Sequence, residues 1–140
     1  MVDALDTQRI DYALAGALAL AVHGVARATT DIDLLVRPED AGAAAAAVAR
    51  IGFTVEALPL RFSDGMEVRR VTKLQGGESL TLDLLLVDEN LEEAWRSRTS
   101  HDTGDGPLWV ISRDALIGMK ARAGRTSDLA DIERLRELDR

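Results

Sequence analysis

The sequence contains no cysteine among its 140 residues. This absence excludes a disulfide framework, a thiolate metal site and a cysteine nucleophile, and it is neutral about the redox compartment. Long apolar runs are missing too: the N-terminus is acidic, and no segment approaches the roughly 20 apolar residues that a membrane span needs. We therefore expect no signal peptide, no membrane partner and a cytoplasmic location.

Internal repeats and linker-like stretches are also absent from the sequence. A chain of this length suffices for one domain, which buries roughly 70% of the surface of its unfolded form. A single domain over residues 1–140 is the prediction.

Positive charge is in deficit, because 24 acidic residues face 17 basic ones and the net charge is −7. Proteins that coat nucleic acids neutralise many phosphates with Lys and Arg, so this balance argues against a broad nucleic-acid surface. The basic residues nevertheless gather within residues 61–73 and 113–125. Each stretch is either a solvated face or part of a local basic groove.

The chain alternates between strand-like and helix-like segments. Apolar periodicity, with glycine and proline as boundaries, predicts helices at residues 4–10, 17–22, 38–51, 90–96, 112–123 and 126–138. It predicts strands at residues 11–15, 31–36, 53–57, 66–71, 80–87 and 108–111, with a hairpin turn at 75–78. Asn90 with Glu93 resembles a capping box, and Ser112 is a candidate N-cap. This succession predicts an α/β (α+β) fold with a mixed β-sheet flanked by helices.

Two carboxylates share one face of the strand at residues 31–36. Side chains alternate between the faces of a strand, so Asp31 and Asp33 point one way while Ile32 and Leu34 point into the core. Adjacent carboxylates repel unless a cation lies between them, and hard oxygen ligands suit Mg²⁺ that carries a nucleotide phosphate. The alternative is a strand-end pair that caps loops or contacts Arg27.

A third carboxylate, Asp83, lies within the apolar strand at residues 80–87. An isolated charge there carries a large desolvation cost, so we expect it to be paired, hydrogen-bonded or bound to a cation. If this strand neighbours the one with Asp31 and Asp33, three carboxylates converge, enough to hold Mg²⁺ and activate a hydroxyl. Gly16 and the first amides of the next helix, Ala17 included, would cradle phosphates from the opposite side.

At this point the chain resembles the minimal nucleotidyltransferases of the DNA polymerase beta superfamily. It looks most like the branch with abortive-infection and toxin–antitoxin type nucleotidyltransferases. The resemblance spans nearly the whole chain and rests on four features: Gly16, the run Gly24-x-x-Arg27-x-Thr29-x-Asp31-x-Asp33, Asp83, and the tail from Leu116 through Lys120 and Arg125 to Asp128 and Asp131.

The resemblance implies a polymerase beta palm-like fold and transfer of a nucleoside monophosphate from an NTP to a hydroxyl, with release of pyrophosphate. By position, Asp31 and Asp33 would bind metal, Asp83 would bind metal or act as the base, and Gly16 would contact triphosphate. The family's turn is usually Gly-Ser or Gly-Gly, whereas Ala17 follows Gly16 here. The backbone N–H of Ala17 stays available although a serine hydroxyl is missing.

Other residues of the motif carry two interpretations each. Arg27 and Thr29 either orient the Asp31 strand or contact phosphate. Lys120, one of only two lysines, is either a phosphate ligand or covers apolar surface with its stem. Asp128 and Asp131 share a helix face and are expected to pair with arginines such as Arg125 or Arg134.

The leading hypothesis is therefore a Mg²⁺-dependent nucleotidyltransferase, with an NTP as substrate. The acceptor stays open: an RNA end such as that of tRNA, a protein or a small molecule. The small size suggests that a small helical partner protein or a second copy completes the acceptor cleft. The rival hypothesis is a non-catalytic interaction or antitoxin-like protein that keeps the fold, and a third is an enzyme that modifies aminoglycosides or lincosamides.

Overall fold

The computed structural model describes residues 1–26, 28–62, 64–104 and 106–138. Its helices are α1 (Val2–Thr7), α2 (Gly16–Val22), the 3₁₀ turn η1 (Pro38–Asp40), α3 (Ala41–Ala49), α4 (Glu92–Arg96), α5 (Arg113–Ala123) and α6 (Thr126–Glu137). Its strands are β1 (Ala13–Ala15), β2 (Asp31–Val36), β3 (Phe53–Glu56), β4 (Leu60–Arg61), β5 (Glu67–Gln75), β6 (Glu78–Leu86), β7 (Thr99–Asp102) and β8 (Pro107–Val110).

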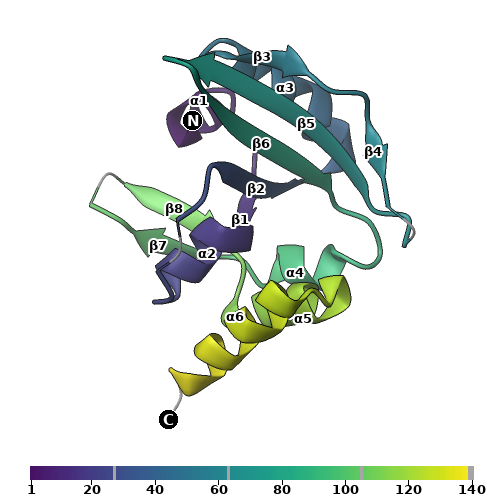
Figure 1. The fold of residues 1–140 in the computed structure, drawn as a ribbon. Helices are drawn as coiled ribbons and strands as arrows, with labels where there is room; N and C mark the ends of the chain where they lie inside the picture. Colours follow the sequence, from purple (N-terminus) through teal and green to yellow (C-terminus); the bar gives the residue numbers. More distant parts are fainter. Residues whose placement is uncertain (27, 63, 105, 139–140) are drawn as a thin grey trace.

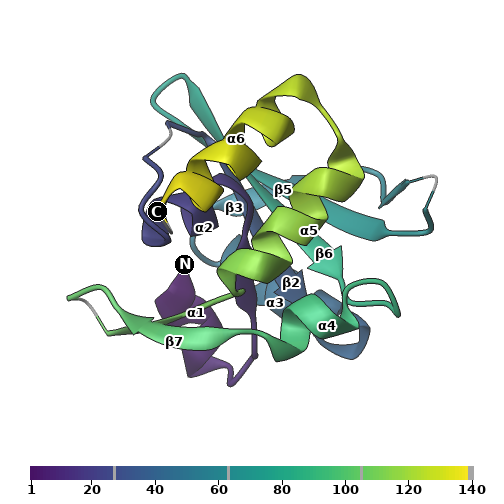
Figure 2. The ribbon, with the colours of Figure 1, turned by 90° about the horizontal axis from the view of Figure 1, so that it is seen from below.

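Within the described residues the strands form one eight-stranded sheet, in the order β3-β5-β6-β2-β1-β8-β7, with β4 paired to β5. The pairs β2–β6 and β1–β8 are parallel and the others antiparallel. Figure 1 shows α3 behind the β3–β5 part of the sheet and α4, α5 and α6 grouped below it. Seen from below, α5 and α6 lie in front of the sheet (Figure 2). The predicted mixed sheet flanked by helices is confirmed.

Alternation along the central strands separates the core from a second, charged face. On β6, Leu82 and Leu84 are fully buried, whereas Asp83 lies between them on the opposite face. The alanines of α3 let that helix pack closely, since Ala44 is fully buried and Val48 completes the contact with the core. Burial of each leucine contributes about 1.5–3 kcal/mol, so the core also fixes where Asp83 points.

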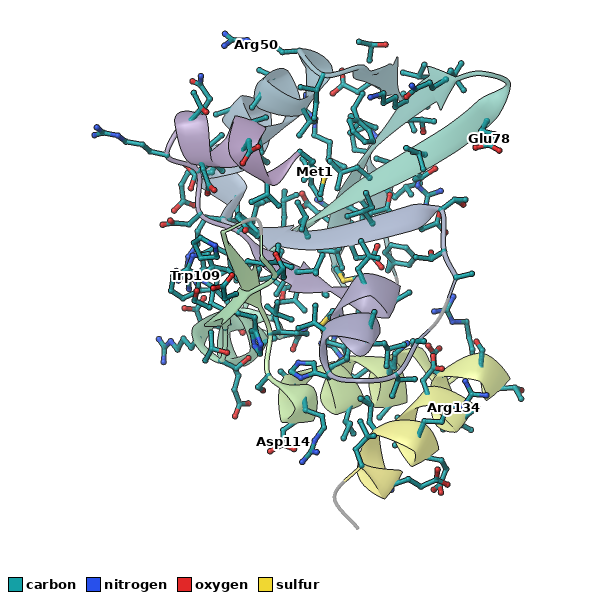
Figure 3. The ribbon with its side chains drawn as sticks, turned by 90° about the vertical axis from the view of Figure 1, so that its left-hand side faces the viewer. Met1, Arg50, Glu78, Trp109, Asp114 and Arg134 are labelled. Atoms are coloured by element: carbon teal, nitrogen blue, oxygen red, sulfur yellow. The ribbon has the colours of Figure 1, made fainter. Side chains whose placement is uncertain are left out.

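Several predicted boundaries are confirmed by the backbone. Ser112 caps α5, because its Oγ accepts a hydrogen bond of 3.0 Å from the amide of Ala115. Gly124 ends α5 in the left-handed conformation at φ 65°. The two-residue turn Gly76–Gly77 joins β5 to β6, both glycines at positive φ. Figure 3 shows Glu78, next to that turn, at the far side of the molecule from Trp109 of β8.

Two predictions about elements are wrong, and the strands β4 and β7 were not predicted. The first helix is Val2–Thr7 and not residues 4–10, because Arg9 takes a positive φ of 56° beyond its end. Asn90 makes no capping box: α4 begins after Leu91, and Asp88 accepts from the amides of Asn90 and Leu91 instead. Strand β7 was not predicted, since its sequence Thr-Ser-His-Asp is polar throughout.

No helix of the described residues is long and apolar enough to cross a membrane.

Candidate active site

Strand register places three charged side chains side by side on one face of the sheet. Asp33 of β2 pairs with Asp83 of β6, and Asp83 pairs in turn with Arg70 of β5. Paired residues of neighbouring strands project to the same face, so the charges run minus, minus, plus across three strands. Asp31, two residues before Asp33, lies opposite Thr81 on this face. The predicted neighbourhood of the Asp31, Asp33 and Asp83 strands is thus confirmed.

Gly16 approaches this row from β1. It has φ +64°, and Ala15 before it pairs with Asp33. A Cβ at Gly16 would lie 2.1 Å from Oδ2 of Asp33, closer than any side chain permits. Only glycine combines the left-handed conformation with this close approach. The start of α2 is therefore fixed against the Asp33 carboxylate.

These residues line a cleft of about 740 Å³ between the sheet and α5–α6. The cleft brings together all the predicted site residues that the structure describes: Gly16, Ala17, Thr29, Asp31, Asp33, Asp83 and Lys120. Arg27, the remaining one, lies outside the described residues. Gly16 and Lys120 are about a hundred residues apart in the sequence, so the fold brings these positions together.

Thr29 holds the start of β2. Its Oγ1 accepts a hydrogen bond of 3.0 Å from the amide of Asp31 and lies 3.2 Å from the carbonyl oxygen of the same residue. This local turn fixes the backbone of Asp31 at the mouth of the cleft. The sequence allowed two roles for Thr29, orienting the Asp31 strand or contacting phosphate. These hydrogen bonds are those of the orienting role.

Asp33 has a raised pKa. Burial, with the negative charges of Asp83 and Asp31 as smaller causes, raises the pKa of Asp33 to about 6, while Lys120 and Arg70 oppose the shift. The cause is that an ionised carboxylate loses hydration here and faces two like charges. A cation in the cleft would relieve both effects.

Asp83 already has a cationic partner. Arg70 donates from Nε to Oδ1 of Asp83 at 2.8 Å and from Nη2 to Oδ2 at 3.0 Å. The hydrogen bonds to Asp83 raise the pKa of Arg70, so the guanidinium stays charged. Among the described residues, no group of three or more His, Asp or Glu side chains is arranged to hold a metal ion. Carboxylate oxygens are the ligands that Mg²⁺ prefers, and Asp31 and Asp33 are the two carboxylates of this row that form no bidentate pair with an arginine of the described residues.

Lys120 forms the opposite wall together with α6. Its ammonium is buried and lies 3.0 Å from Oδ2 of Asp131 and 3.5 Å from Oδ1 of Asp128. Arg125 donates from Nε to Oδ2 of Asp128 at 2.7 Å, and this bond holds the pKa of Asp128 below its usual range. The predicted pairing of Asp128 with Arg125 is confirmed. Lys120 does not lie over apolar surface but bridges two buried carboxylates.

Sequence reasoning missed three features of the cleft. Arg70 and Arg125 belong to its wall, and Arg122 donates to Asp64 at 2.5 Å, which links α5 to the segment before β5. The sequence did contain a signal for these arginines, namely the clustering of basic residues within 61–73 and 113–125. Of the two interpretations of that clustering, a solvated face or a local basic groove, the groove applies to these three residues. Not every basic residue of the 61–73 stretch faces the cleft, because Arg69 points away from it and pairs with Glu56.

No protein-family model matches the sequence, and a search of curated proteins finds no match. Solved structures do match. The antibiotic-resistance factor ANT(2'')-Ia in solution superimposes with a TM-score of 0.61 at 18% identity, over 96% of this chain and 77% of that chain. Its crystal structure in complex with adenylyl-2''-tobramycin gives 0.58 at 18% identity, over 96% and 82%.

A candidate nucleotidyltransferase from Thermotoga maritima gives a TM-score of 0.65 at 17% identity, over 99% of this chain and 88% of that chain. The chain therefore has the nucleotidyltransferase fold. The likeness is one of fold, and the resemblance to the toxin–antitoxin branch stays a prediction.

Proposed function

We propose that the protein is a Mg²⁺-dependent nucleotidyltransferase that moves a nucleoside monophosphate from an NTP to a hydroxyl acceptor and releases pyrophosphate and a proton. The observation that carries this proposal is the meeting of Gly16, Asp31 and Asp33 in one cleft. A glycine turn packed against a carboxylate pair is the arrangement that a metal-bound triphosphate needs.

Each side chain has a role in this proposal. Asp31 and Asp33 hold Mg²⁺, which when bound would neutralise their repulsion and polarise the phosphate. The amides of Gly16 and Ala17 bind phosphate oxygens, and Thr29 fixes Asp31. Lys120 and Arg125 supply positive charge near Asp33, although both are also paired with α6 carboxylates.

The acceptor is proposed only as a class, a hydroxyl on an RNA end, a protein or a small molecule. The fold shared with ANT(2'')-Ia, whose crystal structure holds adenylyl-2''-tobramycin, favours including small molecules. A role in a toxin–antitoxin pair remains one form of the same proposal. The non-catalytic alternative predicts no transfer to any acceptor.

Transfer of label tests the proposal directly. The protein is incubated with each α-³²P-labelled NTP, Mg²⁺ and a cell extract, and we expect one labelled product that chelation of Mg²⁺ abolishes. A γ-labelled NTP should not label this product, because the γ-phosphate leaves with pyrophosphate. Asp33→Asn should abolish the product, whereas Asp114→Asn, the same change at an exposed position of α5 (Figure 3), should keep it. Absence of α-label transfer with all four NTPs would favour the non-catalytic partner.

A further inference from the structure

Arg70 occupies the place beside Asp83 where a cation would bind. It comes from β5, directly across the ladder from Asp83, and binds both oxygens of that carboxylate in the bidentate arrangement. The Asp83 side chain is 14% exposed and that of Arg70 is 43% exposed, so the pair lies at the floor of the cleft with the arginine nearer solvent. A guanidinium does not lose its proton in proteins, so this positive charge is permanent.

The pair has a consequence for metal binding. A divalent cation that used Asp83 would have to displace two charge-assisted hydrogen bonds or sit against a like charge. Asp31 and Asp33 carry no such bidentate arginine among the described residues, and Asp33 faces two negative neighbours. The row of charges therefore offers one position for an added divalent cation, next to the permanently charged guanidinium of Arg70.

We propose that Arg70 is a positioning residue that holds Asp83 as a fixed ion pair and so limits the site to one divalent cation, bound by Asp31 and Asp33. The proposal rests on the proposed function, because it concerns the metal of that same site. It assigns Asp83 as the anchor of Arg70 and not as a metal ligand. It also makes a numerical statement, one metal ion per protein–nucleotide complex.

The same strand supplies a matched control. Arg69, next to Arg70, projects to the other face of β5 and donates from Nε to Glu56 at 2.8 Å. Arg69→Met removes one charge from the same strand without touching the cleft. Arg70→Met removes the cation beside Asp83 while keeping much of the apolar stem, and Arg70→Lys keeps a positive charge there.

The test counts bound Mn²⁺ by the loss of its free electron paramagnetic resonance signal, in the presence of one equivalent of a non-hydrolysable NTP analogue. We expect one Mn²⁺ per complex in the parent protein, in Arg69→Met and in Arg70→Lys, and two in Arg70→Met. Without metal, Arg70→Met should melt at a lower temperature than the parent, because Asp83 loses its partner. Added Mn²⁺ should raise the melting temperature of the variant and so remove this difference.

The outcomes separate the two proposals. Two Mn²⁺ ions in the parent, or one in Arg70→Met with unchanged affinity, would overturn the role of Arg70 and leave the proposed function standing. Mn²⁺ binding in the presence of the parent protein that is no stronger than binding by the analogue alone would overturn both. If Arg70→Met does not fold, Arg70→Lys still decides: two ions in that variant, whose charge is retained, would contradict the proposal.

Discussion

At the scale of single residues, Gly16 has the strictest geometric requirement in the site. Alanine there would adopt φ +64° and place its Cβ 2.1 Å from Asp33 Oδ2. We expect Gly16→Ala to lower the free energy of unfolding by about 2–5 kcal/mol through strain and overpacking. Gly76→Ala is the control, because Gly76 has φ 59° with nothing near its Cβ position, and should lose only about 1–2 kcal/mol. Urea unfolding of both variants measures this, and equal losses would contradict the close approach.

Asp33 links the site to pH. Its folded-state pKa of about 6 lies above the ordinary value of 3.8, so the native protein binds more protons than the unfolded one between those values. The contribution of Asp33 to stability is therefore present below about pH 4 and is lost as pH rises to 6, by roughly 2–3 kcal/mol.

Asp33→Asn should remove this loss. In metal-free buffer the variant should be more stable than the parent at pH 7, and the difference should shrink as pH falls from 6 to 4. Urea unfolding at several pH values measures it, and the parent–variant difference isolates Asp33 from other titrating groups. A variant less stable than the parent at pH 7 would instead assign Asp33 a structural hydrogen-bonding role.

The carboxylates were predicted from sequence, and so was the pairing of Arg125 with Asp128, whereas Arg70 as the partner of Asp83 was not. An aspartate within an apolar strand needs a partner, and that physical argument located Asp83 and its neighbourhood. The identity of the partner depended on which residue of β5 lies opposite, and a one-residue shift of register would have put Arg69 there instead of Arg70. In a hairpin the register follows from the turn, so the predicted turn at 75–78, with Gln75 opposite Glu78, already implies that Arg70 lies opposite Asp83; this signal was not used in the prediction from sequence.

At the scale of elements, Lys120 joins α5 to α6 from inside. Its side chain is 10% exposed and those of Asp128 and Asp131 are 2% and 4% exposed. Removal of one member of a buried charge network leaves the others poorly compensated. We expect Lys120→Met to lower the free energy of unfolding by about 3–5 kcal/mol, and addition of Asp131→Asn to recover part of it.

Lys73→Met provides the comparison, because Lys73 is the other lysine of the chain and lies over the Phe53 ring at the edge of the sheet. It should lose less than about 1 kcal/mol. Denaturant unfolding of the three variants measures these values. Similar losses for the two lysine variants would mean that the α5–α6 network contributes no more than a surface contact.

The start of α2 allows a second element-scale prediction. Ala17 follows Gly16 in the cleft wall, where a serine hydroxyl would add one donor for a phosphate oxygen. Ala17→Ser should therefore increase the melting-temperature shift that Mg²⁺-NTP produces. Ala21→Ser, an exposed position on the same helix outside the cleft, should leave the shift unchanged. Identical shifts in both variants would exclude contact between residue 17 and phosphate.

Elements with clear apolar periodicity or glycine boundaries were predictable, and those defined by their partners were not. β5 and β6 alternate and share a glycine turn, so both appear in the sequence. β7 is a polar edge strand that exists through its pairing with β8, from Thr99 opposite Val110 to Asp102 opposite Pro107. α4 has no side-chain cap, and Asp88, outside the predicted segment, accepts from the amides of Asn90 and Leu91 just before the helix, because several polar side chains compete for exposed amides.

At the scale of the whole molecule, the cleft depends on segments from both ends of the chain. α2 and β2 supply Gly16 and the Asp31–Asp33 pair, whereas α5 supplies Lys120 and the connection from α5 to α6 supplies Arg125. Figure 2 shows α5 and α6 lying across the sheet that carries the acidic row. A ligand that contacts both walls therefore stabilises the folded chain as a unit.

The most direct test of the account is the melting temperature with Mg²⁺ and an NTP, compared with Mg²⁺ and the corresponding nucleoside. A ligand at about 100 times its Kd adds about 2.7 kcal/mol to the folded state. We predict a shift of several degrees with Mg²⁺-NTP, a smaller one with the nucleoside, and none with NTP in Asp31→Asn or Asp33→Asn. No NTP-dependent shift at millimolar ligand in the parent and in Ala17→Ser would contradict a triphosphate site in this cleft.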